Sequence, residues 1–253
     1  MKHSILPNKK MNNSFLVLIL ALLAFSITSC NKDDDEPTSE ISEEEAAEVI
    51  AMAVSPESGG IVEQTTEAIY VIEVDNTSGK SVEDYECGVE YGSSYNRSGN
   101  TSTITYSVDY GWSWIVTCGE GLFPLAADFT MDGSSSYVGP KISSEGAITA
   151  TIKVENLDGA QGTYNLTEDF SFNATQESFV RNKTTFTSTI KLTTSNLAVL
   201  KSNYNITSGT VAASFVGVSS SGNTYDFSGT VKFNGNQTAT ITMGSGNTYD
   251  IAW

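Results

Sequence analysis

Carboxylates are the side chains in this sequence best equipped for acid–base chemistry. The chain holds 30 Asp and Glu residues but a single histidine, His3, at its extreme N-terminus. Histidine-based catalytic triads and histidine-containing zinc sites are therefore excluded for the rest of the chain. A glycoside hydrolase needs two carboxylates at a defined separation, and Asp109 and Glu120 are the nearest candidates. We expect no enzyme, with a carboxylate-dependent hydrolase as the lower alternative.

Two acidic loops carry oxygen ligands of the kind that calcium prefers. They are Asp75–Gly79 and Asn156–Gly159, and neither matches the spacing of an EF-hand loop. Asx turns, in which a side-chain oxygen accepts a nearby backbone N–H, explain both more simply. The sequence therefore predicts no metal and no cofactor.

Apolar side chains, four of them aromatic, occupy every second position of Tyr106–Cys118, which is typical of a long strand with one aromatic face. Such rings can stack on sugars or line an apolar cavity, whereas strict alternation with Val108 and Val116 favours a core role. Tyr91 and Tyr95, close to an expected turn at Asn96–Thr101, are the better candidates for exposure. The candidate ligand contacts are Tyr91, Tyr95, Tyr110, Trp112 and Trp114.

The N-terminus has the pattern of a signal peptide. Three lysines precede the apolar run Ser14–Ile27, which is shorter than the roughly 20 residues of a membrane-spanning helix. The residues Ile27-Thr28-Ser29-Cys30 resemble the lipobox of bacterial lipoproteins. This resemblance implies cleavage before Cys30, acylation of Cys30, and an anchor in the lipid bilayer.

An acidic cluster follows Cys30 directly. The residues Asn31-Lys32-Asp33-Asp34-Asp35-Glu36 resemble the export signal of Bacteroidota surface lipoproteins. That resemblance implies an outer-membrane protein that faces the cell exterior. It covers only residues 1–36, so it implies a location and no activity.

The net charge is −17 at pH 7, which argues against binding to nucleic acids or to anionic membranes. Cys87 and Cys118 are the other two cysteines, and export to an oxidising compartment makes a disulfide between them plausible. A hairpin turning at Asn96–Thr101 would place Cys87 opposite Tyr110 instead. The disulfide therefore requires another strand register, or a loop that brings Cys87 close to Cys118.

The chain divides into residues 1–29 as signal peptide, residues 30–60 as acylated cysteine and acidic tether, and residues 61–253 as one β-rich domain. Within the tether, Ser42 and Glu45 have the spacing of a capping box. They predict a short helix that starts at residue 43 and ends at Ser55-Pro56.

The segment Ile61–Val74 is compatible with a helix or a strand. From about Cys87 onward the apolar residues recur with period two, and Asn234–Asn236 and Gly244–Asn247 are good hairpin turns. We therefore expect a mainly β fold, either an antiparallel β-sandwich or an incomplete β-barrel or meander, preceded by one or two short N-terminal helices.

These features favour a non-catalytic surface lipoprotein that binds or docks a glycan, a small apolar ligand or a surface protein. The alternative is a lipocalin-like carrier of small apolar ligands, in which the aromatic face lines an internal cavity.

Overall fold

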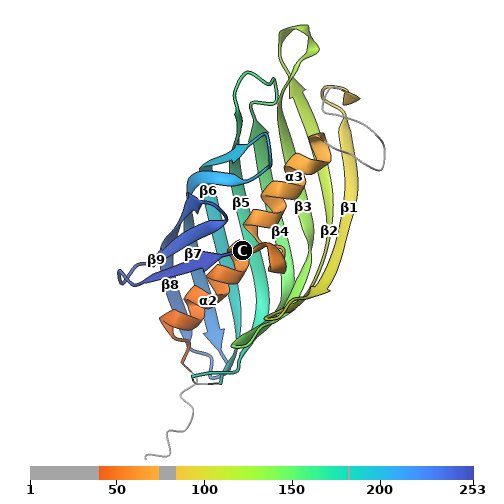
Figure 1. Ribbon diagram of the computed structural model, residues 1–253. Helices are drawn as coiled ribbons and strands as arrows, with labels where there is room; N and C mark the ends of the chain where they lie inside the picture. Colours follow the sequence, from red (N-terminus) through yellow and green to blue (C-terminus); the bar gives the residue numbers. More distant parts are fainter. Residues whose placement is uncertain (1–39, 74–83, 182) are drawn as a thin grey trace, which may run out of the picture. The chain divides into compact units, whose positions relative to one another are not determined.

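A computed structural model describes residues 40–73, 84–181 and 183–253 of the chain. Ten antiparallel strands form one open sheet, and each strand pairs with its neighbours in sequence (Figure 1). The predicted mainly β fold is confirmed, and its architecture is a meander in one sheet rather than a two-sheet sandwich. Cys30 with its lipobox and the loop Asp75–Gly79 lie outside the described residues.

Most strands are long, and buried and exposed side chains alternate along them. Their bounds are β1 (Glu90–Asn100), β2 (Thr105–Cys118), β3 (Pro124–Val138), β4 (Ile142–Glu155), β5 (Thr163–Ser178), β6 (Thr185–Leu200), β7 (Ile206–Ser219), β8 (Thr224–Gly235), β9 (Thr238–Met243) and β10 (Thr248–Ala252). Between β2 and β3 lies the 3₁₀ turn η3 (Glu120–Leu122). Because side chains alternate across a pleated strand, one face of the sheet is apolar and the other is rich in Ser and Thr.

Two helices and a short 3₁₀ turn cross the concave, apolar face of the sheet (Figure 1). They are α2 (Glu43–Val54), η1 (Pro56–Ser58) and α3 (Ile61–Glu73). The predicted capping box is confirmed, since the Glu45 amide donates to Ser42 Oγ at 3.2 Å and the Ser42 amide donates to Glu45 Oε2 at 2.9 Å. No helix in the described ranges has the length and apolarity to cross a membrane.

Two glycines allow the helices to follow each other closely. Gly59 has φ of 70°, a left-handed conformation that costs glycine little. A Cβ on Gly60 would lie 2.3 Å from the Ala53 carbonyl oxygen, so a larger residue could not fit there. The ambiguous segment that follows becomes α3, because its helical spacing buries Ile61, Ile69 and Ile72 against the sheet.

Surface ion pairs fasten α2 to the loops at one end of the sheet. Arg181 lies 2.7 Å from Glu48 and 2.8 Å from Glu44, and Lys141 lies 2.8 Å from Glu48. The helix expected within the acidic tether thus packs on the sheet, and residues 37–253 form one compact unit.

The first hairpin turns at Thr101–Ile104, and the expected turn at Asn96–Thr101 is wrong. Asn100 pairs with Thr105, while the Thr101 hydroxyl accepts the amide of buried Ile104 at 3.1 Å. This register carries Cys87 opposite Cys118, where a disulfide joins them with their Cα atoms 5.7 Å apart. The disulfide expected from the cysteine count is therefore present, and Cys87 does not face Tyr110.

Candidate functional site

The aromatic face of β2 lies in the core. Tyr110 is 1 % exposed, and Trp112 and Trp114 are 4 % exposed. Trp112 and Trp114 each pack against Phe129, with ring centroids 5.8 Å apart. These rings support the fold beneath the helices, and none of the three is available to stack on a sugar in solution.

Tyr91 and Tyr95 are half-buried rather than exposed. They project from β1 toward the helix side, because they pair with Trp114 and Tyr110, whose side chains face the core. Tyr91 stacks on Trp114 with centroids 6.0 Å apart, and Tyr95 stacks on Tyr110 at 4.9 Å. Tyr95 thereby reaches a group of charged side chains on the helix side of β1.

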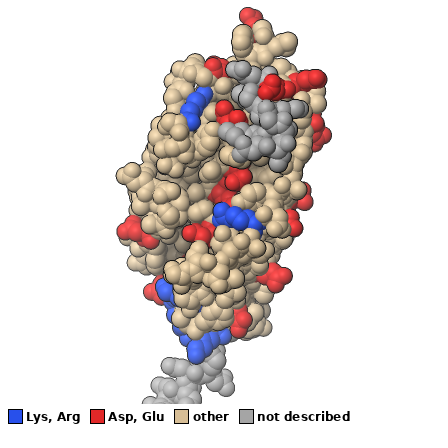
Figure 2. Space-filling model, turned by 45° about the vertical axis from the view of Figure 1, so that its right-hand side comes forward, with Lys and Arg blue, Asp and Glu red and all other residues tan. Residues whose placement is uncertain are grey.

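A cluster of charged and tyrosine side chains lies between α3 and the strands β1 and β2. The Tyr95 hydroxyl donates to Glu63 Oε1 at 2.6 Å, and an Arg97 guanidinium nitrogen lies 3.0 Å from Glu63 Oε2. Arg97 also donates to the Pro56 carbonyl at 3.0 Å, so β1 is tied to both η1 and α3. Figure 2 shows basic atoms bordered by acidic atoms in a hollow of this face. We name the group of Glu63, Glu67, Tyr95, Arg97 and Tyr110 the α3–β1 cluster.

Burial gives the two acids of this cluster unusual proton affinities. It raises the pKa of Glu63, and this outweighs the opposing effects of the Tyr95 hydrogen bond and the Arg97 charge. Burial and the nearby Glu63 charge raise the pKa of Glu67 to about 7. The two glutamates stand four residues apart on α3, a spacing that places their side chains on one helix face. Glu67 can therefore gain or lose a proton near neutral pH.

A third acid lies deeper on the helix side of the sheet. Glu168 on β5 is fully buried and accepts a hydrogen bond from Thr65 Oγ1 of α3 at 3.0 Å. Burial raises its pKa well above the ordinary value. Through the Thr65 hydrogen bond this acid links α3 to the centre of the sheet.

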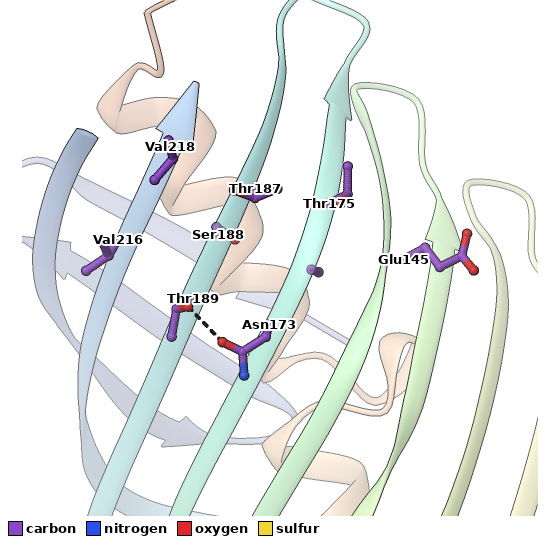
Figure 3. A pocket seen from close by; sticks show the side chains of 9 residues that line it. Glu145, Asn173, Thr175, Thr187, Ser188, Thr189, Val216 and Val218 are labelled. Atoms are coloured by element: carbon purple, nitrogen blue, oxygen red, sulfur yellow. Dashed lines mark hydrogen bonds between the residues drawn. The ribbon is translucent and has the colours of Figure 1, made fainter. Parts of the chain in front are cut away.

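Shallow grooves mark the opposite, convex face of the sheet. One of about 410 Å³ is lined by Glu145, Asn173, Thr175, Thr187, Thr189 and neighbouring valines. Figure 3 shows Asn173, Thr175 and Thr189 projecting from the side turned away from the helices, with Thr189 donating to Asn173 at 2.7 Å. Two further grooves of about 440 and 510 Å³ continue this one, since neighbouring grooves share lining residues.

Strand register explains why the grooves are continuous. Successive pairings align one residue from each of seven neighbouring strands, all exposed except the half-buried Ser136: Ser98, Ser107, Ser136, Glu145, Thr175, Thr187 and Val218. With strands about 4.8 Å apart, this hydroxyl row extends across roughly 29 Å. Small hydroxyl side chains dominate it, so the grooves offer many weak hydrogen-bonding groups beside the apolar surface of valines such as Val138 and Val218.

The carboxylates singled out from the sequence do not meet. Asp109 lies mid-strand on β2, whereas Glu120 follows the end of that strand at Cys118, which is about 30 Å further along. In the loop Asn156–Gly159, Asp158 Oδ1 accepts the Ala160 amide at 3.2 Å, as an Asx turn requires. The described residues contain no group of three or more His, Cys, Asp or Glu side chains placed to hold a metal ion.

Comparison with known proteins identifies no relative of this chain. No family model, curated protein or solved structure matches the chain. The candidate sites are therefore the α3–β1 cluster and the hydroxyl row. Sequence reasoning missed the hydroxyl row. For the α3–β1 cluster it named Tyr95 and Tyr110 as candidate ligand contacts but missed the charged members, although the spacing of Glu63 and Glu67 was a signal.

Proposed function

We propose that this protein is a lipid-anchored surface protein that binds a neutral, hydroxyl-rich polymer such as a glycan without catalysis. The hydroxyl row and its grooves carry the proposal. An extended chain laid across the strands would exchange hydrogen bonds with Ser, Thr and Asn side chains along its length. The strongly negative net charge disfavours an anionic polymer and leaves a neutral glycan as the better ligand.

Two other functions have less support. A carrier of small apolar ligands would need the concave side, which α2 and α3 occupy. A hydrolase built on Asp109 and Glu120 would need these residues in one cleft, and the length of β2 separates them. Binding on the exposed convex face requires no rearrangement of the fold.

Electrophoresis of the purified protein through gels containing dextran or mannan tests the binding. We expect one of these neutral polysaccharides to retard the protein, and Thr175→Arg to abolish the retardation by placing a long charged side chain in the grooves. Thr230→Arg is the matched control, since Thr230 is also exposed in mid-strand but lies outside the three grooves. Equal retardation of both variants would contradict a role for the row.

The anchor is tested separately in the cell. Labelled palmitate should enter the protein, and Cys30→Ser should remove the label and release the chain from the membrane fraction. Protease added to intact cells should degrade the anchored protein if it faces the exterior. Label retained by the serine variant would refute acylation at Cys30.

A further inference from the structure

The α3–β1 cluster contains hydrogen-bond acceptors that no donor in the described residues satisfies. Tyr110 is 1 % exposed, yet its hydroxyl has no hydrogen-bond partner. Glu63 Oε2 likewise accepts no hydrogen bond of good geometry, although Arg97 lies 3.0 Å from it. Arg97 Nε, a donor in the same cluster, has no hydrogen-bond partner either. Buried polar groups are almost always hydrogen-bonded, so three unsatisfied groups in one cluster require an explanation.

These groups point to the same place. Tyr95 and Tyr110 are directly paired across β1 and β2, and their rings stack with centroids 4.9 Å apart. The Tyr95 hydroxyl reaches Glu63 at 2.6 Å, and the charges of Glu63 and Glu67 also act on the Tyr110 hydroxyl. Glu67 stands on the same face of α3 and accepts no hydrogen bond from the described residues.

The charges of the cluster are unbalanced. The Glu63 charge acts on Glu67, the Glu57 charge acts on Glu63, and among the described residues Arg97 is the cation that acts on both. The Arg97 side chain is 37 % exposed and pairs with Glu63, so no ion pair within the described ranges includes Glu67. One more cation would therefore bring the net charge of the cluster closer to zero.

We propose that the α3–β1 cluster binds the primary ammonium group of a small organic amine. An ammonium group has three N–H donors and no acceptor. They would donate to the Glu67 carboxylate, Glu63 Oε2 and the Tyr110 hydroxyl. A quaternary ammonium lacks these donors, and calcium prefers six to eight oxygen ligands, more than this cluster supplies. The site lies on the helix side of the sheet, so it is independent of the glycan-binding face.

Proton release accompanies the binding of such a ligand. Glu67, whose pKa is about 7, is largely protonated at a pH about one unit lower. A bound ammonium favours the ionised carboxylate, so binding should expel a proton from Glu67. This linkage gives the site a signature that non-specific adsorption of an amine lacks.

Calorimetric titration of the purified protein with butylamine, up to about 50 mM, tests the site. At a pH about one unit below the pKa of Glu67, we expect saturable binding, with close to one proton released per amine when two buffers of different ionisation enthalpy are compared. Tetramethylammonium should bind at least roughly tenfold more weakly, because it cannot donate hydrogen bonds. No saturable heat, equal binding of tetramethylammonium, or binding of calcium chloride in place of the amine would each overturn the proposal.

Two conservative variants locate the site. Glu67→Gln keeps the size of the side chain and should weaken butylamine binding roughly tenfold and abolish the proton release. Tyr110→Phe removes only the unsatisfied hydroxyl and should also weaken binding. Their controls are Glu90→Gln at an exposed position of β1 and Tyr137→Phe at another buried tyrosine, which should both bind butylamine as the native protein does. If Glu67→Gln or Tyr110→Phe folds, as judged by circular dichroism, and binds butylamine unchanged, the proposal is wrong.

Discussion

Arginine–glutamate pairs attach both helices to the sheet, but the glutamates differ in their exposure to solvent. Arg181 binds Glu44 and Glu48 of α2, and the Glu44 side chain is 60 % exposed. Arg97 binds Glu63 of α3, and the Glu63 side chain is 3 % exposed. Each pair joins an arginine of the sheet or its loops to a glutamate of a helix. Solvent exposure, more than geometry, should therefore decide what each pair contributes.

Proton affinities show the difference directly. Burial alone would raise the pKa of Glu48, but hydrogen bonds and charges from Arg181 and Lys141 lower it below the ordinary value. At Glu63 burial prevails, and the pKa is raised despite Arg97 and Tyr95. The attachment of α2 is thus stabilised at neutral pH and weakens as the pH falls. The attachment of α3 is strongest at acidic pH and weakens as the pH rises.

Removing Arg97 should have the largest effect on stability. Arg97→Ala leaves the carboxylate of Glu63 buried without a cation, and we expect a loss of about 3 kcal/mol in the free energy of unfolding. Urea denaturation measures it. Adding Glu63→Gln should restore a large part of the loss, because the double variant no longer buries a charge. A loss below about 1 kcal/mol in the single variant would show that the pair is screened by solvent.

An intermediate effect is expected from pH. The folded protein raises the pKa of Glu67 to about 7, so its stabilising contribution is complete below the unfolded pKa of 4.5 and is lost as the pH rises through 7. Discounted for partial exposure, the loss between about pH 5 and pH 8 should be about 1–2 kcal/mol. Denaturation at both pH values measures it. Glu67→Gln should remove this part of the pH dependence, and an unchanged dependence would assign it to another group.

The smallest effect is expected at the ion pairs of α2, whose glutamates are more accessible to solvent than Glu63. Arg181→Ala should cost about 1 kcal/mol or less, and about 0.5 M salt should reduce that cost further. Denaturation at low and high salt gives both values. A cost equal to that of Arg97→Ala would remove the contrast between the two helices.

Local patterns in the sequence predicted much of this fold. Ser42 and Glu45 are neighbours along the chain, so their capping box could be recognised directly. The period-two pattern predicted which side chains of β2 face the core, and short turns predicted the meander. Each of these features depends on residues close together in sequence.

Features that depend on distant residues were missed. The expected turn at Asn96–Thr101 has favourable turn residues, but the Thr101 hydroxyl and the burial of Ile104 move the turn further along. The pairing of Glu63 with Arg97 required knowing that Ile61–Glu73 is a helix and that it lies beside β1. The hydroxyl row required the register of seven strands, and one misplaced turn changes that register.

The disulfide has a consequence for proteolysis. Cys87 and Cys118 enclose the whole first hairpin, including the exposed tip between Thr101 and Thr103. A protease that cleaves this tip would leave two fragments covalently joined, with β1 still paired along β2. The nicked protein would migrate as one chain until a reductant is added, and the tip could be lost to cleavage without releasing the edge of the sheet.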